Sequence, residues 1–241
     1  MATRTKATRT RAFSVALVGA DGAGKTTIAR RLERDHPLPV RYIYMGVNPA
    51  AGERLLPSTR LRARLWPSRS QHAGGPPDAS RVRAPAVSLG GRLRSAVRSG
   101  LRVGNLVAEE WYRQLRAWAE LRRGNVVVFD RHFLSDFHFH DMSGRSTLPL
   151  SRRLHGFLLA RVYPRPDLVI CLDAPPEILY GRKPEGTVDL LARRRQEYLD
   201  QAGSEGDVVV IDASRPLDVV AADVFDVVSS FAGATTRRRT A

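Results

Sequence analysis

A glycine-rich stretch near the N-terminus has the residue types and spacing of a phosphate-binding loop. The run is Gly19-Ala-Asp-Gly-Ala-Gly-Lys-Thr-Thr27, which fits the P-loop pattern G-x-x-x-x-G-K-[ST]. Glycines let the backbone curl so that successive N–H groups point at phosphate oxygens, and the dipole of a following helix favours the same anion. Lys25 is expected to reach the β- and γ-phosphates of ATP, and the hydroxyl of Thr26 to bind Mg²⁺. The residues predicted to bind ATP are Gly19, Asp21, Gly22, Ala23, Gly24, Lys25, Thr26 and Thr27.

A second pair of charged residues follows another apolar segment. Asp130 and Arg131 come directly after Val126-Val-Val-Phe129, which is typical of a buried strand. A carboxylate at a strand end beside a P-loop can orient Mg²⁺ or accept a proton, and the adjacent guanidinium can hold a phosphate with two hydrogen bonds. The alternative is an ion pair that only caps the strand.

A third group of cations lies in the C-terminal half. Arg182-Lys183 follow a helix-like turn at 176–180, and Arg193-Arg194-Arg195 lie in the next helical pattern. Phosphoryl transfer needs cations that stabilise the negative charge spread over the transferred group, and a movable lid can supply them. Because neighbouring residues diverge around a helix, at most two of the three consecutive arginines can face one site. The alternative is that these residues are solvated helix ends.

The order of predicted elements positions these groups. Strand-like and helix-like patterns alternate along the chain, which predicts a parallel sheet covered on both faces. Ligands of such sheets bind at the carboxyl ends of the strands, where the P-loop, Asp130-Arg131 and Asp173 all fall. The predicted strands are 13–18, 40–44, 126–129, 168–172 and 208–211, and the predicted helices are 26–33, 106–122, 151–162, 190–201 and 217–231.

Length and composition are those of one globular α/β domain. The chain has 241 residues and a formal net charge of +15, with 39 lysines and arginines of which only Lys6, Lys25 and Lys183 are lysines. Such a charge suits an anionic partner, but the arginine excess is also expected from a GC-rich genome. The single cysteine, Cys171, lies in an apolar run and predicts a buried thiol, which suits the cytoplasm. No apolar stretch reaches the length of a membrane span.

Residues 48–104 interrupt the alternation of strands and helices. Between Arg54 and Arg102 the chain has eleven arginines and one acid, Asp78. This pattern predicts a mobile arginine-rich insertion, or short helices such as 60–65 and 93–97 around a flexible centre. An anion-binding flap is an alternative, whereas nucleic-acid binding is disfavoured because Trp66 is the only aromatic residue in that stretch. The expected organisation is a disordered basic tail at 1–11, a single kinase domain at 12–233 that includes the insertion 48–104, and a disordered basic tail at 234–241.

Three motifs together resemble the thymidylate kinase family of P-loop nucleotide kinases. They are the P-loop with an aspartate in third position, Asp130-Arg-His-Phe-Leu-Ser135, and Leu172-Asp-Ala-Pro-Pro-Glu177. The resemblance covers 13–47 and 105–232 but not the insertion. It implies a three-layer α/β/α sandwich of the P-loop NTPase type, with a five-stranded parallel sheet of order 2-3-1-4-5 and the insertion after strand 2.

The resemblance also implies a function and a set of roles. The function is phosphoryl transfer from ATP to a nucleoside monophosphate, with dTMP as the default acceptor and Mg²⁺ as the cofactor. Asp21 is expected near the acceptor sugar hydroxyl, and Arg131 on the acceptor phosphate. Arg113 is expected on the acceptor side, and Arg182 as the lid cation. The implied catalytic residues are Lys25, Asp130, Arg131 and Arg182, and the implied metal ligands are Thr26 and Asp130.

The sequence departs from the family pattern on the acceptor side. Met45-Gly-Val-Asn-Pro-Ala50 stands where the family has R-E-P-G-G-T, and Glu109 stands where it has an arginine against the base. Two alternatives therefore stay open, a P-loop kinase of another small acceptor and a non-enzymatic ATP-binding or nucleic-acid-binding module. The sequence also leaves a homodimer open.

Overall fold

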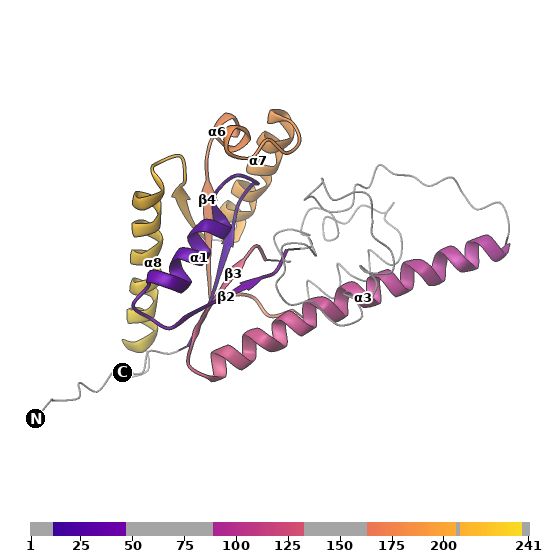
Figure 1. Cartoon of the computed structure of the whole chain (residues 1–241), viewed down its shortest axis with the longest axis horizontal. Helices are drawn as coiled ribbons and strands as arrows, with labels where there is room; N and C mark the ends of the chain where they lie inside the picture. The colour runs from indigo at the N-terminus through magenta and orange to yellow at the C-terminus, as the bar shows by residue number, and fades with distance from the viewer. Residues whose placement is uncertain (1–11, 47–88, 133–162, 206–207, 238–241) are drawn as a thin grey trace, which may run out of the picture.

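The computed structural model describes residues 12–46, 89–132, 163–205 and 208–237 (Figure 1). The tail at 1–11, residues 48–88 of the insertion, the helix predicted over 151–162 and the last four residues lie outside this part of the chain.

The core of the fold is a five-stranded parallel sheet. Its strand order is β2-β3-β1-β4-β5, which confirms the predicted order 2-3-1-4-5. In register, Leu17 lies opposite Asp130, Val18 opposite Cys171, and Asp173 opposite Asp212. The carboxyl ends of the strands therefore meet at one edge of the sheet. The strands are β1 (Ser14–Val18), β2 (Val40–Tyr44), β3 (Val126–Asp130), β4 (Leu168–Asp173) and β5 (Val208–Asp212).

Both faces of the sheet are covered by helices. Successive side chains of a strand point to opposite faces, so β1 sends Val15 and Leu17 to one side and Ala16 and Val18 to the other. The first face packs against α1 (Lys25–Asp35) and α8 (Leu217–Arg237), which lie together in Figure 1. The second face packs against the C-terminal part of α3 (Leu89–Arg122). This is the three-layer α/β/α arrangement that the sequence predicts.

Four helices are longer than the sequence predicts, α1 and α7 (Val188–Glu205) slightly at each end, and α3 and α8 at one end. Helix α3 begins at Leu89 rather than at residue 106, so the end of the arginine-rich insertion is helical, and Figure 1 shows it extending beyond the sheet. Glycines inside a helix cost roughly 1 kcal/mol each, and here they do not end it. Helix α8 continues to Arg237, through the first residues of the expected C-terminal tail.

Two further helices stand beyond the carboxyl end of β4. Helix α6 (Pro176–Arg182) follows β4 directly, and α7 (Val188–Glu205) precedes β5. Within the described residues, no helix combines the length and the apolar character needed to cross a membrane.

The P-loop and α6 touch through their backbones at Gly22. Gly22 has a φ of 88°, and a Cβ built on it would lie 2.4 Å from the carbonyl oxygen of Leu179 in α6. Gly24 has nearly the same φ, 89°, but a Cβ there would meet nothing within 4 Å. Of these two glycines, only Gly22 combines a positive φ with a close approach of another main chain. Gly19, with a φ of 133°, does the same, because a Cβ built on it would lie 2.3 Å from the carbonyl oxygen of Leu172 in β4.

We expect Gly22→Ala to lower the free energy of unfolding more than Gly24→Ala does. Both variants carry the cost of a left-handed non-glycine residue, roughly 1–2 kcal/mol. Gly22→Ala must in addition displace α6 from the loop. Urea unfolding of both variants measures the difference, and equal losses would contradict the close approach.

Candidate functional site

The P-loop connects β1 to α1 and presents backbone N–H groups at the start of that helix. Its glycines at 19, 22 and 24 all have positive φ, which lets the chain curl tightly between strand and helix. Gly24 is the N-cap residue of α1, no side chain caps the helix, and its first turn contains no acidic residue. A helix N-terminus with these features favours an anion such as phosphate.

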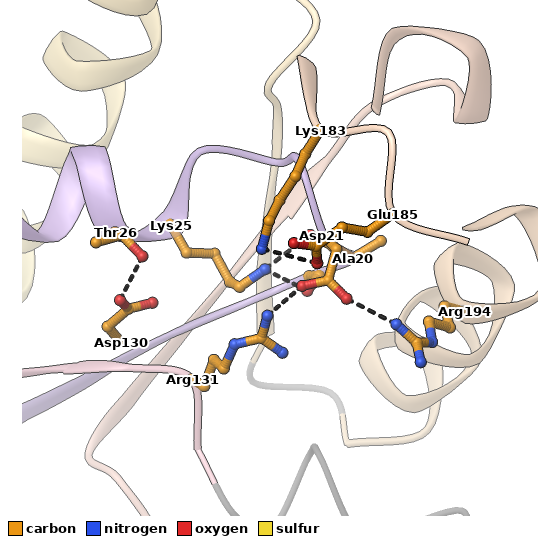
Figure 2. A network of polar contacts seen from close by, with 10 residues as sticks. Ala20, Asp21, Lys25, Thr26, Asp130, Arg131, Lys183, Glu185 and Arg194 are labelled. Atoms are coloured by element: carbon orange, nitrogen blue, oxygen red, sulfur yellow. Dashed lines mark hydrogen bonds and ion pairs between the residues drawn. The ribbon is translucent and has the colours of Figure 1, made fainter. Parts of the chain in front are cut away.

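Lys25 folds back across the loop that precedes it. Its Nζ donates hydrogen bonds to the carbonyl oxygens of Gly19, at 2.8 Å, and of Ala20, at 2.7 Å (Figure 2). The residue is only 5% exposed. The ammonium group is therefore held within the loop, where a bound polyphosphate would meet it.

Asp130 ends β3 and is fully buried, with 0% exposure. The Thr26 hydroxyl donates to its Oδ2 at 2.6 Å, and the Tyr42 hydroxyl donates to the same oxygen at 3.0 Å. Its other oxygen, Oδ1, is buried and has no hydrogen-bond partner in the described part of the chain. An unpaired buried carboxylate oxygen beside a threonine hydroxyl is the hard oxygen donor set that Mg²⁺ prefers, so these residues fit the ion.

Arg131 follows with a strained backbone. Its φ is 65°, and it is the one non-glycine residue with positive φ among those described. Its backbone N–H donates to the Leu17 carbonyl of β1 at 3.1 Å, which fixes this turn against the neighbouring strand. Backbone strain of this kind costs of order 1–3 kcal/mol and is found at functional sites. The turn directs the guanidinium to Asp21 of the P-loop, with which it forms an ion pair.

Asp21 connects the P-loop to two other elements. Besides Arg131, it accepts a hydrogen bond from Arg194 of α7 at 2.7 Å (Figure 2). Burial alone would raise the pKa of Asp21, but the positive charges of Arg131, Lys25 and Arg194 outweigh it and hold that pKa below its usual value. The carboxylate is therefore ionised at neutral pH, surrounded by three cationic side chains.

The three consecutive arginines of α7 have separate surroundings. Arg194 faces the P-loop, as described above, and Arg195 donates to both carboxylate oxygens of Asp173 at 2.6 and 2.7 Å. This pairing raises the pKa of Arg195. Arg193 is exposed. Two of the three thus face the sheet edge, within the limit that helix geometry sets.

The predicted lid residues lie at the end of α6 and directly after it. Arg182 donates to the carbonyl oxygens of Ala213, at 2.7 Å, and Ser214, at 3.4 Å, just after β5. Lys183 pairs with Glu185 at 3.0 Å. In this structure Arg182 therefore joins α6 to the end of β5, whereas Arg194 is the C-terminal arginine that contacts the P-loop.

Arg113, which the sequence predicts on the acceptor side, lies against the segment that follows β2. It is buried on α3, donates to the carbonyl of Gly46 at 2.6 Å, and pairs with Glu109 at 3.4 Å. A Cβ at Gly46 would lie 2.7 Å from the Arg131 side chain. Arg113 and Arg131 thus approach Gly46 from two sides.

The structure brings most of the predicted site residues to one edge of the sheet. The P-loop residues, Asp130 and Arg131 share a set of direct contacts. Arg182 instead binds carbonyls after β5, and Arg113 binds the carbonyl of Gly46 after β2. Sequence reasoning missed Tyr42, although the two-residue period of a strand places it on the same face of the sheet as Val40 and Tyr44. It named Arg194 only as one of three alternatives, because a run of identical residues does not show which one faces inward.

Comparison with known proteins assigns the chain to a family. The family model described as thymidylate kinase matches residues 93–224. The chain belongs to the thymidylate kinase family. The matched region includes Asp130, Arg131, Arg182 and Arg194, and the P-loop lies before it.

Two curated relatives are similar to this chain, and both are described as probable thymidylate kinases. The protein of Archaeoglobus fulgidus is 33% identical over 118 residues, which cover 46% of this chain and 57% of that relative. The protein of Pyrobaculum aerophilum is 28% identical over 221 residues, which cover 89% of this chain and 95% of the relative.

The histidine after Arg131 is buried beside the site. His132 is 1% exposed and packs against Phe129 with ring centroids 5.4 Å apart. Burial lowers the pKa of His132 to about 3, so the folded protein holds this imidazole neutral at neutral and mildly acidic pH. The unfolded chain takes up a proton near the usual pKa of 6.5. Between these values the unfolded state binds more protons, so stability falls as the pH falls.

We expect the free energy of unfolding of His132→Gln to depend less on pH below pH 6.5 than that of the wild-type protein. From pH 6.5 to pH 5 the wild-type protein should lose about 1.6 kcal/mol of unfolding free energy through this group, because the slope approaches about 1.4 kcal/mol per pH unit only below pH 6.5. The variant lacks the titrating imidazole and should lose less. Urea unfolding at a series of pH values measures both slopes, and parallel profiles would show that His132 is not the group responsible.

Proposed function

We propose that the protein is a nucleoside monophosphate kinase that transfers the γ-phosphoryl group of ATP to an acceptor phosphate. Family membership supports this reaction class. The observation that carries it is the convergence at one sheet edge of the P-loop with Lys25, the Thr26–Asp130 pair, and Asp21 with its two arginines. Phosphoryl transfer depends on positioning and on positive charge, and this edge provides both.

The donor side is proposed to work as follows. The P-loop N–H groups and the N-terminus of α1 hold the ATP phosphates, and Lys25 exchanges its carbonyl partners for β- and γ-phosphate oxygens. Thr26 and Asp130 would hold Mg²⁺, which would neutralise charge on the phosphates. Asp130 is the residue whose unpaired Oδ1 supports this role.

The acceptor side is proposed to use the cations that now surround Asp21. Arg131 binds the acceptor phosphate, and Asp21 accepts a hydrogen bond from a sugar hydroxyl of the acceptor. An oxygen of the acceptor phosphate forms a bond to the γ-phosphorus as the bond from that phosphorus to the β–γ bridging oxygen breaks, and ADP leaves. The attacking oxygen is already ionised at neutral pH, so the step needs no general base.

We propose dTMP as the default acceptor. The two relatives, both described as probable thymidylate kinases, support this choice. Glu109, which is buried and pairs with Arg113, stands where the family pattern has an arginine against the base, and this departure favours a second candidate, another small acceptor. The proposal includes a cytoplasmic location, supported by the free buried thiol of Cys171, and the homodimer stays a prediction.

A panel of acceptors tests the function. Purified protein with ATP and Mg²⁺ is offered dTMP, the other nucleoside monophosphates and nucleosides, and products are identified by mass. We expect acceptor-dependent ADP release with dTMP as the preferred acceptor. Lys25→Ala should lower the rate by about 10²–10³, the loss typical of a preorganised charge-stabilising group. ADP release that no acceptor stimulates would contradict a kinase, and phosphorylation of a different acceptor would contradict only dTMP.

A set of arginine variants tests which cation acts on the transferred group. Arg182→Ala is expected to lower kcat and kcat/KM together by about 10², with little change in ATP affinity. Arg194→Ala should show a similar loss, because Arg194 already contacts the P-loop. Arg193→Ala is the matched control on the same helix and should stay within about twofold, as surface substitutions do. Wild-type kinetics of Arg182→Ala beside a large loss in Arg194→Ala would assign the role to Arg194 alone.

A further inference from the structure

Tyr42 makes a contact with the proposed metal site that the motifs do not account for. Its hydroxyl donates to Oδ2 of Asp130 at 3.0 Å, although the two residues lie on different strands. In the register of β2 and β3, Tyr42 lies opposite Val128, two residues before Asp130. Such diagonal neighbours share one face of the sheet and are within reach of an aromatic side chain. The contact is therefore a direct product of strand pairing.

Helix α1 contacts Tyr42 both at its ring and at its backbone. The guanidinium carbon of Arg30 lies 3.9 Å from the ring centroid, a cation–π contact. The carboxylate of Glu33 accepts a hydrogen bond from the Tyr42 backbone N–H at 3.1 Å. Helix α1 thus begins at the P-loop and, two turns later, fixes the tyrosine that reaches back to the proposed metal site.

The two oxygens of the Asp130 carboxylate have different surroundings. Thr26 and Tyr42 both donate to Oδ2, while Oδ1 is buried without a hydrogen-bond partner in the described residues. A carboxylate held by one oxygen cannot turn freely about its χ2 angle, so the other oxygen keeps one direction. An unpaired buried oxygen is costly to maintain, and a bound cation would satisfy it.

We propose that Tyr42 is a positioning residue that locks the Asp130 carboxylate so that Oδ1 is presented to the Mg²⁺ that accompanies the nucleotide. The inference rests on the proposed function, because it takes Asp130 as a metal ligand. Hydrogen-bonded partners of metal ligands typically contribute 10–100-fold to metal affinity. Thr26 would move to the ion when it binds, and Tyr42 would then be the hydroxyl that keeps the carboxylate oriented.

Binding of ADP with and without Mg²⁺ tests the role without relying on activity. Calorimetry of the full chain in Mg²⁺ and in EDTA gives the factor by which the ion strengthens ADP binding. We expect Tyr42→Phe to reduce this factor about tenfold and to leave ADP affinity in EDTA unchanged. In the kinase assay the Mg²⁺ concentration for half-maximal rate should rise, while kcat at saturating Mg²⁺ recovers. Tyr112→Phe, which removes one hydroxyl from α3, is the matched control and should keep the wild-type factor.

Three outcomes separate this inference from the function on which it rests. If Mg²⁺ strengthens ADP binding by the wild-type factor in Tyr42→Phe but by a reduced factor in Asp130→Asn, the role of Tyr42 is overturned and the metal site stands. A wild-type factor in Asp130→Asn would overturn both. If Tyr42→Phe does not fold, Arg30→Ala keeps the hydroxyl and frees the ring. This variant should then reduce the factor in the same direction by a smaller amount, and no reduction would overturn the inference.

Discussion

The buried carboxylate of Asp21 is the interaction on which the arrangement of the site depends. A buried charge is tolerated only when it is paired, and Asp21 pairs with Arg131 beyond β3 and Arg194 on α7. Three segments distant in sequence are thereby held around one anion. Without it, two guanidinium groups and Lys25 would repel one another across the same small space. The carboxylate therefore keeps a concentration of positive charge in place before any phosphate arrives.

The parallel sheet makes this convergence possible and stabilises the unfavourable backbone conformations that it requires. The P-loop, the Arg131 turn and Asp173 all leave the sheet at the carboxyl ends of adjacent strands, with registers that bring them level. The left-handed backbone of Arg131 and the tight glycine turns are unfavourable locally. They persist because the strands on either side are buried on both faces and cannot relax. The Asp173–Arg195 pair extends the same principle to α7, because it holds that helix at the sheet edge and so directs Arg194 inward.

The proposed acceptor side, at the end of β2 and on α3, has side chains that depart from the family pattern. Arg113, Gly46 and Arg131 are in contact, so the end of β2 and α3 are coupled to the residue proposed to hold the acceptor phosphate. Gly46 leaves room for the Arg131 side chain, and the Arg113 hydrogen bond holds the Gly46 carbonyl in place. Family membership establishes the fold around this region, whereas acceptor choice is decided by the individual side chains that line it. Glu109, which pairs with Arg113, is one of the residues by which this sequence departs from the family pattern there.

Local sequence determined the elements and the P-loop, because hydrophobic periodicity and glycine spacing are short-range properties. All five strands lie where the apolar runs predicted them, and the phosphate-binding loop follows directly from its motif. The start of α3 at Leu89 was not predictable, because an arginine-rich stretch with glycines has no strong periodicity of its own. Tertiary structure alone decided the partners of the side chains. Which of three arginines meets Asp21, that Arg182 binds carbonyls after β5, and that Tyr42 reaches Asp130 all depend on strand register and on the rotation of α7. These are relations between segments far apart in the chain, and no local pattern specifies them.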